Sequence, residues 1–151
     1  MDKKIRALTR AAWRALPIFE AAKPDDDRPR RALDLVDRWL SGEAVDAHAL
    51  MMATGSVAGA RGRERFQHGW QWSAYTIERA VEAAWLGRVQ PGSQWAPDGF
   101  KAAQQAAKVA AHETTTEEHK YRPTDDITPI AFERADDARR AEWMIQQADL
   151  A

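Results

Sequence analysis

The sequence predicts an all-α protein, folded as a single-domain helical bundle of about five or six helices. The 151 residues are rich in alanine, arginine, glutamate and aspartate and poor in β-branched residues, which favours helix over strand. Apolar residues recur at three- and four-residue spacing in several stretches. Glycine and proline separate these stretches, as short connections between helices require.

The first helix is expected over residues 3–16, or as far as Ala22. Pro17 either kinks it or restarts it, because proline lacks an amide proton and clashes with the preceding turn. The polar face of this helix is basic and carries Arg6, Arg10 and Arg14.

A stiff turn follows, in which Pro24 and Pro29 bracket the aspartates at positions 25–27. Pro29 suits the first turn of a second helix, and the aspartates just before it can cap free amides there. The apolar spacing continues to Leu40, and Gly42 is a typical left-handed stop.

Residues 16–43 resemble part of a small helical family, the immunity proteins of bacterial polymorphic toxin systems. The motif runs from an LP-x-FE pattern through an acidic run into R-P-R-x-A-L, followed by a tryptophan and a Gly-Glu pair. The resemblance extends over residues 1–90 and implies a helical, non-enzymatic binding protein, without established site residues. The matching residues are Leu16, Pro17, Phe19, Glu20, Asp26, Asp27, Arg28, Pro29, Arg30, Ala32, Leu33, Trp39, Gly42 and Glu43.

Two further helices are expected over residues 46–60 and 63–86, which complete a core formed by residues 1–90. The second of these should be the centre of the core and end at Gly87. Its Trp70 and Trp85 are expected in the core, whereas Trp72 fits either the core or an interface. Trp72 and Tyr75 are residue types favoured as interface anchors.

Residues 97–150 should add an alanine-rich helix, an acidic loop and a C-terminal helix. The breaker-rich segment 88–99, with Trp95 as a lid on the bundle, connects them to the core. The alanine-rich helix should cover residues 98–115, and the loop residues 112–129. The last helix should begin at Thr128 and Pro129, run to Asp149 and present one small apolar face. That face consists of Ala138, Ala141, Ile145 and Ala148.

Composition excludes several function classes. The net charge of −1 argues against a strongly basic nucleic-acid binder and against an acidic DNA mimic. Without cysteine the chain has no disulfide, thiolate metal site or cysteine nucleophile, which suits a reducing cytoplasm. Neither a signal peptide nor a membrane span is expected. His112 and His119 do not match a metal-binding motif, so neither a metal nor another cofactor is predicted.

The sequence therefore predicts a cytoplasmic protein without catalytic residues that neutralises a toxin or nuclease by occlusion. Two alternatives stay open: a phage-encoded, anti-CRISPR-like inhibitor of a defence nuclease, and a nucleic-acid-binding helical module using Arg6, Arg10, Arg14, Arg61 and Arg63. A homodimer is also open, because the last helix could pack on its own chain or on a second copy. The predicted partner-binding residues are Asp25, Asp26, Asp27, Arg28, Arg31, Trp72 and Tyr75.

Overall fold

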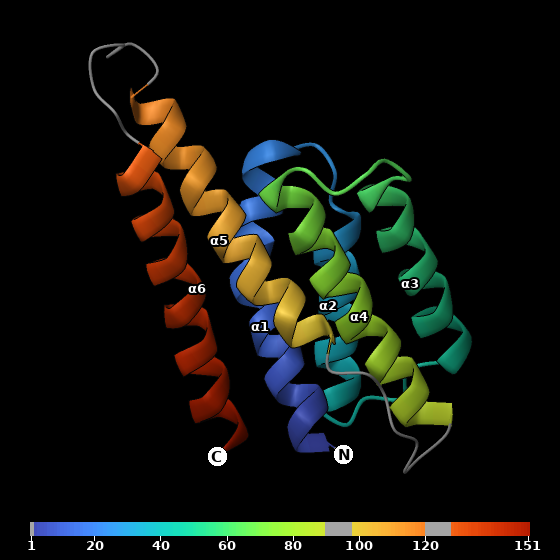
Figure 1. The fold of residues 1–151 in the computed structure, drawn as a ribbon. Coiled ribbons are helices and arrows are strands. Elements are labelled where there is room, and N and C mark those ends of the chain that lie inside the picture. The colour runs from blue at the N-terminus through green and yellow to red at the C-terminus, as the bar shows by residue number, and fades with distance from the viewer. Residues whose placement is uncertain (1, 90–97, 120–127) are drawn as a thin grey trace.

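The computed structural model describes residues 2–89, 98–119 and 128–151, and these residues form one helical bundle (Figure 1). The predicted fold class is thereby confirmed. In chain order the helices are α1 (Asp2–Ala22), α2 (Arg28–Leu40), α3 (Ala47–Arg61), α4 (Gly69–Val89), α5 (Asp98–His119) and α6 (Thr128–Leu150).

Helix α4 lies at the centre of the bundle, as predicted, and contacts α1, α2, α3 and α5. Its buried apolar side chains meet those of α1, which runs without interruption through Pro17. Trp70 and Trp85 are half-buried and pack against the core. The largest apolar side chains of the main cluster are Ile5, Leu8, Leu16, Leu33, Val36, Val45, Leu50, Val57, Ile77, Val81 and Phe100.

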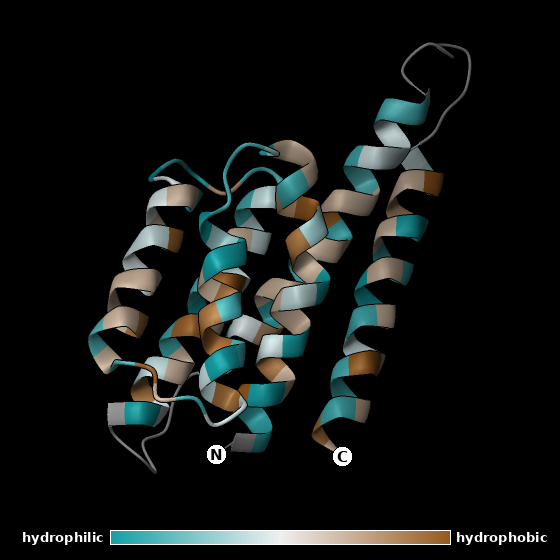
Figure 2. Cartoon of the chain, turned by 180° about the vertical axis from the view of Figure 1, so that it is seen from behind, coloured by the Kyte–Doolittle hydropathy of each residue, from teal (hydrophilic) through white to brown (hydrophobic). Residues whose placement is uncertain are grey.

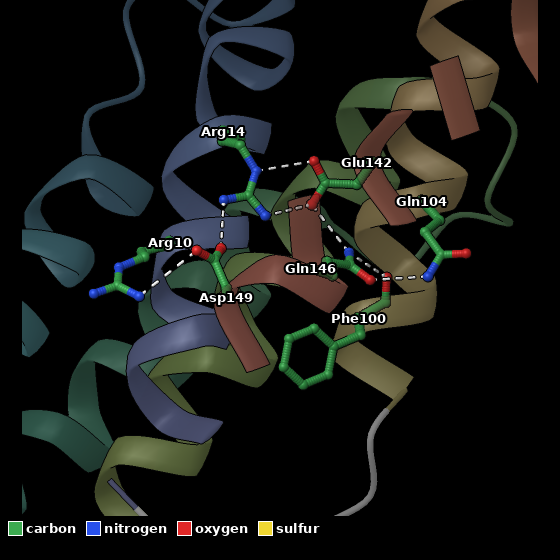
Figure 3. Close-up of polar contacts among 7 residues, drawn as sticks. All are labelled: Arg10, Arg14, Phe100, Gln104, Glu142, Gln146 and Asp149. Carbon is green, nitrogen blue, oxygen red and sulfur yellow. Dashed lines mark hydrogen bonds and ion pairs between the residues drawn. The ribbon is translucent and has the colours of Figure 1, made fainter. Parts of the chain in front are cut away.

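Helix α6 is held by polar contacts, shown in Figure 3. The guanidinium of Arg14 in α1 donates two hydrogen bonds to the Glu142 carboxylate, at 2.9 and 3.0 Å, and a third to Asp149 at 3.0 Å. Gln146 is buried and donates to the carbonyl of Phe100 in α5 at 3.0 Å. We call Arg14, Glu142, Gln146 and Asp149 the polar clasp.

The prediction of which residues form the apolar face of the last helix is wrong. Helix α6 buries Ala131, Ala135, Glu142 and Gln146 instead. Ala141, Ala148 and Ile145 are exposed, Ile145 to 43%. The contacts of the polar clasp, rather than hydrophobicity, determine which face of α6 turns toward α1 and α5. Figure 2 shows hydrophobic segments of α6 at the edge of the molecule.

Several predicted helix ends are also corrected. Helix α4 begins at Gly69 rather than near Arg63, because residues 62–68 form a loop held by Gln71. It continues through Gly87, where a Cβ would lie 2.7 Å from Ile5 Cδ1, so this glycine allows close packing and does not end the helix. Helix α5 extends to His119 and takes up the start of the predicted loop. The rest of that loop, like Trp95, lies outside the described residues.

The contact between Gly69 and α5 generates a stability prediction. A Cβ at Gly69 would lie 3.0 Å from the backbone nitrogen of Ala110 and 3.1 Å from its Cα. Since backbone cannot move aside cheaply, we expect Gly69→Ala to lower the free energy of unfolding by about 1–3 kcal/mol. Urea unfolding followed by circular dichroism measures the change.

Gly55→Ala is the matched control, because a Cβ there meets nothing within 4 Å. In the interior of α3 this substitution should raise the free energy of unfolding by about 0.5–1 kcal/mol. Equal effects of the two substitutions would contradict the close contact between α4 and α5.

Candidate protein-binding surface

Three aromatic rings gather where α4 meets the loop that precedes it. Phe66 in the loop packs edge-on against Trp72 and Tyr75 of α4, with ring centroids 4.7 and 5.5 Å apart. The Trp72 and Tyr75 centroids lie 6.5 Å apart. All three side chains are half-buried, so they fix one another while keeping part of each ring at the surface.

Two arginines stack on these rings. The Arg61 guanidinium at the end of α3 lies 5.4 Å from the Phe66 ring centroid and 5.7 Å from that of Tyr75. The Arg79 guanidinium, one turn along α4, lies 6.0 Å from the Tyr75 centroid. We call these five residues, Phe66, Trp72, Tyr75, Arg61 and Arg79, the aromatic–arginine cluster.

Neighbouring carboxylates hold the polar ends of the cluster's side chains in place. Arg61 Nε donates to Glu78 at 2.8 Å, and Tyr75 Oη donates to Asp98 of α5 at 2.8 Å. Arg79 donates to the other oxygen of Asp98 at 3.1 Å. The first residue of α5 therefore links the tyrosine and an arginine, and holds the ends of both side chains in place.

The electrostatics of the cluster follow from these contacts. Burial raises the pKa of the Tyr75 hydroxyl, and its bond to the Asp98 carboxylate raises it further. Burial alone would lower the pKa of Arg79, but the neighbouring carboxylates of Glu82 and Asp98 outweigh it and raise that pKa. The tyrosine therefore stays neutral and the arginine stays charged at neutral pH, so the surface offers an aromatic hydroxyl and fixed cations.

A buried side chain positions the loop that carries Phe66. The Gln71 side chain, 1% exposed, accepts hydrogen bonds from the amides of Gln67 and His68 at 2.7 and 2.9 Å. It also donates to the carbonyl of Arg65 at 3.1 Å. From α5, Glu113 accepts hydrogen bonds from the Gly69 amide and pairs with His68, which fixes the start of α4.

The other predicted site residues lie in the turn between α1 and α2 and in the first turn of α2. The Asp26 carboxylate accepts hydrogen bonds from the side chain of Arg28 at 2.7 and 2.9 Å, and from the Arg28 amide at 3.2 Å. Asp27 occupies the N-cap position but its side chain makes no capping hydrogen bond, so the Asp26 carboxylate takes the Arg28 amide, while Asp27 pairs with Arg31 at 3.2 Å on the exposed side. Asp25 is exposed, and residues 22–28 line a surface depression.

The structure does not join the turn and the aromatic–arginine cluster into one flat surface. Arg28 of the turn approaches α3 at Gly59, where a Cβ would lie 3.1 Å from its Nη1. The cluster uses Arg61, two residues further along α3, which is about 200° around the helix. In Figure 1 the turn between α1 and α2 and the loop between α3 and α4 lie at the same end of the bundle.

Trp72 and Tyr75 were predicted from the sequence as partner-binding residues, but the other members of the cluster were not. Arg61 was named only for the nucleic-acid-binding alternative, and Phe66 and Arg79 for no binding function. One feature of the sequence could have indicated Arg79 as a member of the cluster. Trp72, Tyr75 and Arg79 have i, i+3, i+7 spacing, which puts an arginine beside two aromatic residues on one helix. The contributions of the loop and of Asp98 depend on tertiary contacts.

The arginines proposed for nucleic-acid binding are largely engaged within the chain. Arg14 belongs to the polar clasp, Arg61 to the aromatic–arginine cluster, and Arg10 lies 3.6 Å from Asp149. Arg6 donates to the carbonyl of Leu40 at 2.8 Å. The carboxylates of Asp149, Glu142 and Glu78 offset the charges of Arg10, Arg14 and Arg61, so these contacts do not favour a phosphate-tracking stripe.

Over residues 2–89, 98–119 and 128–151, no group of three or more histidine and carboxylate side chains is placed to hold a metal ion. His112 packs against Phe132 of α6, with ring centroids 5.4 Å apart. In the same ranges, no helix combines the length and apolar character that crossing a bilayer demands.

Comparisons with protein-family models, curated proteins and solved structures gave no match to this chain. The resemblance to immunity proteins thus stays a prediction from the sequence.

The ion pair in the turn generates a pH-dependent prediction. The hydrogen bond from Arg28 lowers the pKa of Asp26 in the folded protein. A lowered folded pKa contributes stability above the unfolded value of about 3.9, which is lost as the pH falls through the folded pKa. We expect Asp26→Asn to lower the free energy of unfolding by up to about 1 kcal/mol at pH 7.

The difference should shrink between pH 7 and an acidic pH below the folded pKa of Asp26, because Asp26 is then protonated in both folded and unfolded chains. Urea unfolding at the two pH values measures it. Asp25→Asn, at an exposed neighbour, is the control and should change little. An undiminished effect of Asp26→Asn at low pH would show that charge is not its cause.

Proposed function

We propose that this chain is a non-catalytic protein-binding protein that neutralises a partner by covering one of its surfaces, in the manner of an immunity protein. The observation that carries the proposal is the aromatic–arginine cluster. It combines three half-exposed rings with two stacked arginines on a rigid part of the bundle.

The composition of the cluster suits a binding hot spot. Tryptophan, tyrosine and arginine dominate the residues whose truncation weakens protein interfaces most. Here the rings are held edge-to-face and the arginines are tied to carboxylates before any partner arrives. Less side-chain entropy is therefore lost on binding, and the rim charges favour one orientation of the partner.

The class of the partner comes from the sequence resemblance, which implies a bacterial toxin in the cytoplasm. Occlusion needs no catalytic group, and the sequence carries no recognisable catalytic motif. An inhibitor of a bacterial defence nuclease would use the same kind of surface, so the identity of the partner decides between these two functions.

The test is an affinity purification from host lysate with the full chain tagged at its C-terminus, followed by quantitative mass spectrometry. The wild type is compared with Trp72→Ala and with Met52→Ala, a control on α3 whose side chain is 57% exposed. We expect one dominant partner, reduced at least about tenfold by Trp72→Ala and unchanged by Met52→Ala. Purified wild type should inhibit the activity of that partner, and Trp72→Ala should not.

Circular dichroism of both variants is needed alongside, with Trp72→Phe as a milder substitution. If Trp72→Ala unfolds the chain while Trp72→Phe folds and binds as the wild type does, Trp72 is a core residue rather than an anchor. Equal losses in the Trp72 and Met52 variants would place the interface elsewhere. Recovery of nucleic acid instead of a protein, with affinity falling steeply as salt rises, would favour the nucleic-acid-binding alternative.

A further inference from the structure

The large exposed hydrophobic side chains concentrate on α6. Among the described residues only two others of this kind occur, Met51 and Met52 of α3. The α6 side chains of this kind lie on several sides of the helix, and Phe132 also packs against His112 of α5. Those of α6 are Ile130 at 43%, Phe132 at 59%, Trp143 at 48%, Met144 at 64% and Ile145 at 43%.

The charges of α6 are ordered along the helix in a self-complementary way. Residues 135–141 form the sequence ADDARRA, in which two aspartates precede Ala138 and two arginines follow it. In an antiparallel copy of the helix centred near Ala138, each acidic pair faces a basic pair. In a parallel copy in register, like charges would face each other instead.

Asp137 and Arg140 lie on the side of α6 that points away from its own bundle. Both are exposed, and the Arg140 side chain is 65% exposed. Arg140 is two residues from the buried Glu142, hence about 200° around the helix. Met144 follows four residues after Arg140 on the same outward side and is 64% exposed.

We propose that a second copy of this chain packs its α6 antiparallel against this surface, with Asp137 of each copy opposite Arg140 of the other. Such a contact is a two-fold symmetric interface, in which the same patch serves both copies. Arg140 now pairs with Asp136 at 2.9 Å, but that pair is exposed and worth little, so Arg140 is free to exchange partners.

The size of the surface sets the strength of the dimer. Helix α6 has 23 residues, so it is about 34 Å long and presents a strip about 10 Å wide. This is less than the roughly 800 Å² per partner of a standard stable interface. The dimer is therefore reversible, and a net charge of −1 per chain opposes it little.

The test is sedimentation equilibrium of the full chain from about 1 µM to about 200 µM. The average mass of the wild type should rise from 17.0 kDa toward twice that value. Asp137→Arg and Arg140→Asp should each weaken dimerisation at least tenfold, because each places like charges opposite one another. An equimolar mixture of the two variants, and the chain carrying both substitutions, should dimerise again.

Lys4→Glu is the control, since it is exposed on α1 and changes the net charge by the same amount as Arg140→Asp. It should dimerise like the wild type. A wild type that stays monomeric up to the highest concentration overturns the proposal. So do single variants that dimerise normally, which would indicate another interface or an exchange of α6 between copies.

Discussion

The burial of α4 by four other helices is the constraint on which the rest of the structure depends. Because α1, α2, α3 and α5 all contact it, its polar residues need partners inside the bundle. Ser73 donates to the carbonyl of Ala15 in α1, and Gln71 bonds the loop before the helix. The part of α4 that these contacts leave at the surface is the part that carries Trp72 and Tyr75. The candidate binding surface is thus a direct consequence of how the centre of the fold is packed.

The sequence was sufficient to predict the limits of a helix where the apolar stripe and the residues that mark its ends indicate the same boundaries. Helix α2 has Pro29 in its first turn, an apolar stripe and Gly42 with a φ of +95° after its end, and its limits follow from these features. Helix α4 shows where such reasoning fails, because Gly87 looks like a helix end but lies against Ile5. A glycine that ends a helix and a glycine that allows close packing look alike until the neighbouring helix is known.

Helix α6 was misjudged for a different physical reason. Its sequence offers two comparable faces, one small and apolar and one with Glu142, Gln146 and Asp149. Periodicity favours the first, but small side chains bury little area, so that choice gains little free energy. Arg14 and the carbonyl of Phe100 lie where they can satisfy the polar face, and removing either partner would leave a buried group unpaired. The candidate cluster was only partly predictable because Phe66, Arg61 and Asp98 come from three separate segments.

The inward position of the polar clasp and the exposed outer face of α6 both follow from one orientation of this helix. When the polar residues turn inward, larger hydrophobic side chains such as Trp143 and Met144 remain exposed. Among the described residues α6 contacts only α1 and α5, and it stands at the opposite edge of the bundle from α3 (Figure 1). An α6-mediated dimer thus leaves the aromatic–arginine cluster of each copy uncovered. Such a dimer presents two clusters at once, which raises the apparent affinity for a partner that is itself dimeric or repeated, without a new contact at either site.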